Sequence, residues 1–146
     1  MRFRKANKKD CKLIFDWANQ KEVRLNSIDN RPIKWDDHKK WFQEKLSSKQ
    51  SQIFIIEEKK PIGQIRIDLS EGFYYIDYFV ELSHRGKGYG KKMIGLLKEK
   101  NKYPLKALVK ESNIISSRVF NSSGFKITES KVIGKNKYIV YEYWKT

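Results

Sequence analysis

The segment Val80-Glu-Leu-Ser-His-Arg85-Gly-Lys-Gly88-Tyr-Gly90-Lys-Lys-Met93 carries the most structural information in this sequence. The run before it predicts a strand, and the apolar spacing after it predicts a helix. The three glycines, Gly86, Gly88 and Gly90, allow a sharp bend between the two. Such a bend gathers backbone N–H groups at the positive end of the helix dipole. We therefore expect this turn to bind phosphate.

Two widespread phosphate-binding loops do not fit this segment. A P-loop that began at Gly86 would need a second glycine at position 91, and Lys91 stands there. The dinucleotide fingerprint needs its third glycine at the same position. An ordinary glycine turn at the end of a strand remains the alternative interpretation.

A second segment, Asn113-Ile-Ile-Ser116-Ser-Arg-Val-Phe120-Asn-Ser-Ser-Gly124-Phe125, follows a short predicted strand. Asn113 can cap the start of a helix, and Gly124 can supply its left-handed end. Together with Arg85-x-x-Gly88-x-Gly90, this segment resembles the paired signatures of the GCN5-related N-acetyltransferases (GNAT). The resemblance extends over nearly the whole chain and implies that acetyl-coenzyme A is bound as co-substrate, with no metal.

The remaining sequence predicts elements in an order that agrees with this resemblance. We expect a single domain over residues 1–146, of the α/β (α+β) class. It has a mixed, mostly antiparallel sheet of six to seven strands flanked by helices, in the order β-α-α-β-β-β-α-β-α-β-β. The predicted strands are 2–6, a hairpin from 52 to 69, 74–81, 105–110, and a hairpin over 125–133 and 137–144. The predicted helices are 10–18, with Asp10 as N-cap, a short one within 19–34, and then 35–46, 88–101 and 113–123.

By resemblance, the cofactor is held by the bent segment, the strand before it and the second signature. The implied residues are Phe79, Val80, Leu82, Arg85, Gly86, Lys87, Gly88, Tyr89, Gly90, Lys91, Asn113, Ser116 and Phe120. Pantetheine is expected to enter between two diverging strands and to pair with the backbone of residues 79–82. A backbone N–H near Val80 is expected to stabilise the oxyanion.

The amine must lose a proton before or during its attack on the thioester, which requires a base. Glu81 is the first candidate, with a solvated strand-end residue as the alternative. Asp68 and Asp77 are weaker, because strand alternation can turn them away from the cleft. Many relatives use a tyrosine at the position of Phe120 to protonate the thiolate, and that role is vacant here. The alternatives are water, Ser117, Tyr89 and Tyr141.

The acceptor side is indicated by segments between Trp17 and Phe42 and by Pro61-Ile-Gly63-Gln64-Ile-Arg66. These are similar to acetyltransferases that modify amino-sugar nucleotides in the pseudaminic acid pathway. The implied acceptor residues are Arg24, Asn26, His38, Trp41, Gln64 and Arg66. Alternatively, Trp17, Trp41 and Phe42 are core residues and His38 packs within its helix.

Composition sets the wider limits. The chain has 146 residues and a net charge of +15, so an anionic partner or a merely solvated lysine surface would each explain the charge. One cysteine, Cys11, and the lack of a long apolar run favour a cytoplasmic protein without a membrane span.

Several alternatives remain open at this point. The acceptor is expected to be a small-molecule amine, for which an anionic one is an option, and the protein is expected to be a monomer or homodimer. A protein N-terminal or lysine acetyltransferase is the second hypothesis for the function. A basic nucleic-acid-binding module is a third, which leaves both signatures unexplained. A degenerate acetyltransferase that only binds the cofactor is the fourth.

Overall fold

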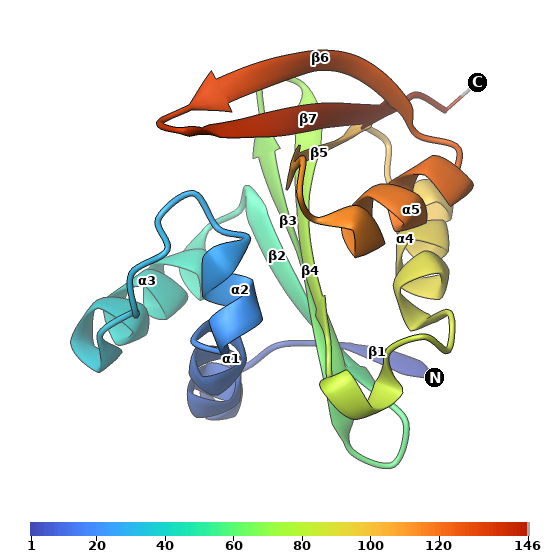
Figure 1. The fold of residues 1–146 in the computed structure, drawn as a ribbon. Helices are drawn as coiled ribbons and strands as arrows, with labels where there is room; N and C mark the ends of the chain where they lie inside the picture. Colours follow the sequence, from blue (N-terminus) through green and yellow to red (C-terminus); the bar gives the residue numbers. More distant parts are fainter. Residues whose placement is uncertain (146) are drawn as a thin grey trace.

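The computed structural model describes residues 1–145 and contains one seven-stranded sheet with helices on both faces (Figure 1). The strand order is β1-β2-β3-β4-β5-β7-β6. The strands are β1 (Arg2–Lys5), β2 (Ser51–Glu57), β3 (Pro61–Ser70), β4 (Phe73–Val80), β5 (Leu105–Lys110), β6 (Lys126–Ile133) and β7 (Asn136–Tyr143). All neighbours pair antiparallel except β4 and β5, which are parallel. The predicted mixed sheet is therefore confirmed. The predicted domain also includes Thr146, which lies outside the described residues.

The helices divide between the two faces of the sheet. The helices α1 (Cys11–Ala18), α2 (Lys21–Leu25) and α3 (Trp35–Ser47) lie on one side of the sheet, and α4 (Tyr89–Lys100) and α5 (Ile114–Ser122) lie on the other (Figure 1). Short 3-10 helices, η1 (Lys8–Asp10) and η2 (Leu82–His84), precede α1 and follow β4. Each face has its own apolar core. Ile65, Met93 and Phe120 belong to the α4/α5 side, and Ile14, Trp17 and Phe42 to the other.

Most boundaries fall within two residues of those predicted, and two details differ. The short helix α2 makes the order β-α-α-α at the start, because residues 21–25 form a separate helix. Asp10 occupies the N-cap position of α1, as predicted, but its side chain makes no capping hydrogen bond there. Asn7 caps the 3-10 turn, and the Asp10 carboxylate instead accepts the Asn7 N–H and bonds both terminal nitrogens of Arg4.

The parallel strands β4 and β5 diverge soon after they meet. Their pairing is limited to Tyr74 with Leu105 and Tyr75 with Lys106. Beyond that point β5 continues to pair with β7, and β4 continues to pair with β3 as far as Val80. The sheet therefore contains a gap between β4 and β5, as the resemblance implied. The gap positions the site described below.

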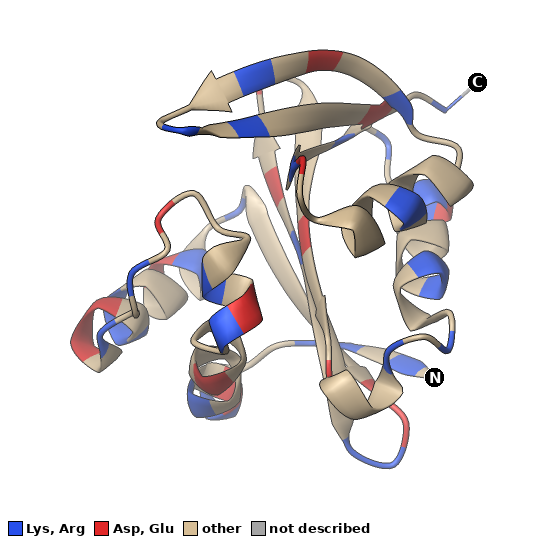
Figure 2. Ribbon diagram, in the orientation of Figure 1, with Lys and Arg blue, Asp and Glu red and all other residues tan. Residues whose placement is uncertain are grey.

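Basic residues are spread over helices, strands and turns of the fold (Figure 2). Ion pairs use part of this charge, for example Arg4 with Asp10 and Lys45 with Asp68. Within residues 1–145 no helix is both long and apolar enough to cross a membrane.

Candidate active site

Two cavities open on opposite sides of the β4–β5 gap. The first, which we name the α5 cavity, has a volume of about 540 Å³ and lies between the diverging strands, α2, the start of α4 and the start of α5. The second, the α3 cavity, has a volume of about 580 Å³ and lies between the same strands and helices α1 to α3. Residues that line both are Val23, Asn26, Ser27, Ile76, Asp77, Tyr78, Phe79 and Leu108. The two cavities therefore meet in the gap.

The glycine-rich turn borders the α5 cavity with free backbone donors. Gly86 and Gly88 have φ angles of 75° and 84°, a left-handed conformation that disfavours any residue with a Cβ. No backbone N–H from Gly86 to Lys91 donates a hydrogen bond to a described residue, because the turn precedes the first bonded N–H of α4, that of Lys92. Gly90 lies inside α4 and is close to the Tyr78 ring, so its role is packing and not bending.

Arg85 has a different role from the one that its place in the motif suggested. Its Nε donates to the Val80 carbonyl at 2.7 Å and its Nη1 to Glu22 Oε1 at 2.9 Å. The guanidinium also lies 5.4 Å from the Phe79 ring centroid. The side chain thus ties α2 to the end of β4.

The backbone of β4 alternates between its two neighbours. The Tyr74 N–H donates to Pro104 O, on the β5 side, and the Glu81 N–H donates to Ile62 O, on the β3 side. Even-numbered residues of this strand therefore direct their N–H groups toward the gap. Val80 meets this condition, whereas the Phe79 backbone faces β3.

The expectation that Leu82 pairs with pantetheine as part of a strand is wrong. β4 ends at Val80, and Leu82 lies in the 3-10 turn η2, 70% exposed. Leu82 lines neither cavity, and the same holds for Lys87, Glu81 and Ser117.

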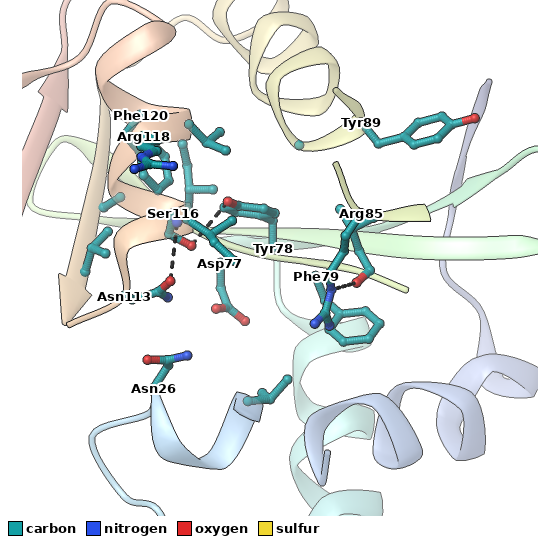
Figure 3. A pocket seen from close by; sticks show the side chains of 18 of the residues that line it. Asn26, Asp77, Tyr78, Phe79, Arg85, Tyr89, Asn113, Ser116, Arg118 and Phe120 are labelled. Carbon is teal, nitrogen blue, oxygen red and sulfur yellow. Dashed lines mark hydrogen bonds between the residues drawn. The ribbon is translucent and has the colours of Figure 1, made fainter. Parts of the chain in front are cut away.

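Glu81 is held away from both cavities. Its carboxylate accepts the indole N–H of Trp17, a residue 64 positions earlier that is 2% exposed. Asp77 and Tyr78, in contrast, line both cavities, and their side chains point in opposite directions from β4 (Figure 3). Asp77 points toward Asn26, which follows the end of α2, and Tyr78 points toward Ser116 of α5.

Tyr78 is the residue that the sequence interpretation missed. Its hydroxyl is 3.2 Å from Ser116 Oγ, and burial raises its pKa above the ordinary value, which keeps the hydroxyl protonated at neutral pH. Its ring packs edge-on against Phe120. A signal existed, because strand alternation places Tyr78 on the face that it shares with Val80.

Helix α5 has the predicted caps. Asn113 Oδ1 accepts the Ser116 N–H at 3.3 Å, and Gly124 ends the helix with a φ of 84°. The Phe125 N–H returns to Phe120 O, and the two rings pack 5.0 Å apart, as in a Schellman motif. Phe120 is 2% exposed and also stacks on Tyr141, so it belongs to the core.

The α3 cavity gathers all the residues predicted to bind the acceptor: Arg24, Asn26, His38, Trp41, Gln64 and Arg66. Trp17 and Phe42 are buried in the core, whereas Trp41 is partly exposed to the cavity. His38 Nε2 lies 2.9 Å from Cys11 O, and burial lowers its pKa, so the ring is a neutral packed group. Burial also raises the pKa of the Cys11 thiol.

Both arginines of the α3 cavity are already bonded within the chain. Arg24 donates to Ala18 O at 2.8 Å and to Asp29 O at 3.1 Å. Arg66 bonds Asp68 at 2.9 Å and lies 3.6 Å from Asp77. These contacts occupy part of each guanidinium.

The predicted cofactor residues also come together. Phe79, Val80, Arg85, Gly86, Gly88, Tyr89, Gly90, Lys91, Asn113, Ser116 and Phe120 all line the α5 cavity. The free N–H groups, the adjacent lysines and the gap beside Val80 suit a diphosphate on an extended arm. Among residues 1–145 no group of three His, Cys, Asp or Glu side chains could hold a metal ion.

Comparisons with known proteins agree with this geometry. A family model described as acetyltransferase (GNAT) domain matches residues 1–126. The chain therefore belongs to the GNAT acetyltransferase family. It is an acetyl-coenzyme A-dependent N-acetyltransferase. No curated protein is significantly similar to it in sequence.

Solved structures show the same fold at low identity. Spermidine N-acetyltransferase from Vibrio cholerae, in complex with CoA and spermine, has a TM-score of 0.82 and 15% identity, covering 97% of this chain and 92% of that one. A putative acetyltransferase from Salmonella typhimurium with acetyl-CoA has a TM-score of 0.80 and 21% identity, with 98% and 92% covered. An aminoglycoside acetyltransferase, AAC(6')-Ib, with coenzyme A has a TM-score of 0.80 and 16% identity, with 97% and 92% covered.

Proposed function

We propose that this enzyme acetylates a primary amine of a small molecule by direct attack on the thioester in a ternary complex. The observation that carries the proposal is the meeting of the two cavities in the β4–β5 gap. The co-substrate occupies the α5 cavity, with its diphosphate on the turn from Gly86 to Lys91. The acceptor occupies the α3 cavity. The two substrates then reach each other without a covalent acyl-enzyme.

The Asp77 carboxylate accepts the proton that the amine loses as its nitrogen attacks, directly or through one water. The position of Asp77 supports this role, because the residue lines both cavities and its side chain points toward the end of α2. Glu81, the first candidate from the sequence, is bonded by the Trp17 indole, so we assign it to positioning the end of β4. The Val80 N–H stabilises the oxyanion.

The Tyr78 hydroxyl donates a proton to sulfur as the carbon–sulfur bond breaks. It lies on the side of β4 that borders the α5 cavity, and its raised pKa keeps the proton in place until then. Ser116, 3.2 Å away, relays a proton back from solvent. Tyr78 thereby fills the role that Phe120 cannot perform. Of the other sources considered, Tyr89 bonds Glu58 and Tyr141 is 2% exposed.

Structural neighbours support a small-molecule acceptor, since their names include spermidine and aminoglycoside acetyltransferases. The amino-sugar-nucleotide acceptor has less support, because Arg24 and Arg66 are bonded internally. We therefore place an amine without a diphosphate ahead of it.

The test is release of free coenzyme A thiol from acetyl-coenzyme A in the presence of diamines, amino sugars, nucleotide amino sugars and peptides with free N-termini. We expect amine-dependent release with at least one small amine. Release with peptides alone would favour the protein-acetyltransferase alternative. Cofactor binding without release for any amine would contradict the proposal and favour a cofactor-binding regulatory protein.

A further inference from the structure

The α3 cavity contains a polar side chain that folding leaves without a partner. Gln64 of β3 is 6% exposed and lines this cavity. Within residues 1–145, Ser123 Oγ is the only fully enclosed side-chain polar atom that lacks a partner. The Gln64 amide also makes no hydrogen bond to the described residues, so its remaining surface must open into the cavity.

The position of Gln64 in the sheet makes the lack of a hydrogen-bond partner informative. In the sheet it lies between Ile55 of β2 and Phe79 of β4, which are 0% and 7% exposed. An apolar side chain would suit such a place, because a buried amide without a hydrogen bond is unfavourable. An unpaired amide aimed into a cavity therefore indicates a group that a ligand supplies.

The same cavity presents two carboxylates as well as two arginines, although the whole chain carries +15. Its charged residues are Arg24, Asp37, Arg66 and Asp77. Both arginines are bonded within the chain. Asp37 makes no ion pair within the part of the chain that the structure describes, and Asp77 has only the 3.6 Å contact with Arg66. The cavity is thus suited to a cationic or hydrogen-bond-donating ligand.

We propose that Gln64 forms a second subsite for the acceptor, which binds a hydroxyl or ammonium group on the same carbon skeleton as the reacting amine. The inference rests on the proposed function and names the substrate class more narrowly: an amine with a second hydrogen-bond donor. Gln64 Oε1 accepts from that donor. The exposed Asp37 carboxylate adds attraction when the second group is charged.

Three amines of equal chain length separate these contributions: n-butylamine, 4-amino-1-butanol and 1,4-diaminobutane. Wild-type kcat/KM, measured by thiol release, should be on the order of 100-fold higher for the two bifunctional amines, because n-butylamine leaves the amide unpaired. Gln64→Leu should reduce kcat/KM for both bifunctional amines toward the value for n-butylamine. Asp37→Asn should reduce only the kcat/KM for 1,4-diaminobutane.

Gln52→Leu is the matched control, since it makes the same change on β2 outside both cavities. It should keep the wild-type preference. Equal wild-type kcat/KM values for all three amines would overturn the subsite while leaving the proposed function intact. This result needs only the wild-type enzyme. If no primary amine supports thiol release, the proposed function fails first. Gln64→Met replaces Gln64→Leu if the latter does not fold, and an unchanged preference in either variant would also overturn the subsite.

Discussion

At the scale of single residues, the site depends on two neighbours that face opposite ways. Side chains alternate along a strand, so Asp77 and Tyr78 of β4 present a carboxylate to one side of the sheet and a hydroxyl to the other. In the proposed mechanism the reacting carbon lies in the gap between them. Asp77 is also oriented through Arg66, which bonds Asp68. Burial opposes ionisation of Asp68, but Lys45, Ser51 and Arg66 together hold its pKa below the ordinary value.

Asp77→Asn should lower kcat by about 100-fold, because the amide cannot accept the proton that the amine loses. The affinity for acetyl-coenzyme A should stay near that of the wild type, since the glycine-rich turn is unaffected. Steady-state kinetics and calorimetry measure the two quantities. Glu81→Gln is the matched comparison and should change kcat far less. The opposite ranking would return the proton-accepting role to Glu81.

Tyr78→Phe should lower kcat by about 10-fold, a modest effect because a thiolate leaves readily even without an acid. The ring packing against Phe120 is kept, so the free energy of unfolding should change little. The raised pKa of Tyr78 means that its hydroxyl stays protonated below about pH 10. The deficit should therefore be constant from pH 6 to pH 9, and a rate equal to the wild type over this range would exclude Tyr78 as the acid.

Sequence alone located residues of this site to different extents. Gly86, Gly88 and Asn113 were identifiable because their roles are local, a left-handed turn and a helix cap. The position of Glu81 was not, because its partner Trp17 comes from a distant helix. Asp77 was ranked lower because strand alternation can turn it away from the cleft, whereas in the structure it lines both cavities and its side chain points toward Asn26.

At the scale of elements, the gap arises because β4 and β5 have different second partners. Strand β4 pairs with β3 along its whole length, and β5 pairs with β7. Between themselves, β4 and β5 pair only at Tyr74 and Tyr75. Periodicity predicted most of these elements, with β5 at its observed bounds, because a strand of alternating burial has a local signature. The short α2 was less defined, since it has no fully buried residue. Its end is tied to β5 by Lys110, which donates to Leu25 O at 2.8 Å.

Gly88→Ala should weaken coenzyme A binding by about 10-fold, equivalent to about 1.4 kcal/mol. Alanine at a φ of 84° is disfavoured, so the turn would shift its N–H groups to relieve strain. Gly95→Ala, inside the helix α4 that follows the turn, is the control. It meets no atom within 4 Å, so it should leave binding unchanged and stabilise the fold by about 0.5 to 1 kcal/mol. Equal affinity for the two variants, measured by calorimetry, would count against the turn as the phosphate site.

At the scale of the whole molecule, the sheet separates two cavities and the gap joins them. Each face of the sheet has its own core, so the helices beside the α3 cavity and those beside the α5 cavity pack into separate apolar clusters. The family resemblance implied the arrangement of strands, and the family match supports it. The chemistry of the acceptor could not be predicted from charge, because the net charge of +15 says nothing of the two carboxylates, Asp37 and Asp77, that line the α3 cavity.

The most direct test of this account is a crystal structure of the protein with coenzyme A. We predict density for the diphosphate on the backbone N–H groups from Gly86 to Lys91, with the pantetheine arm beside Val80 and its sulfur on the Tyr78 side of the gap. Density with the glycine-rich turn empty, or with the pantetheine outside the gap between β4 and β5, would contradict it.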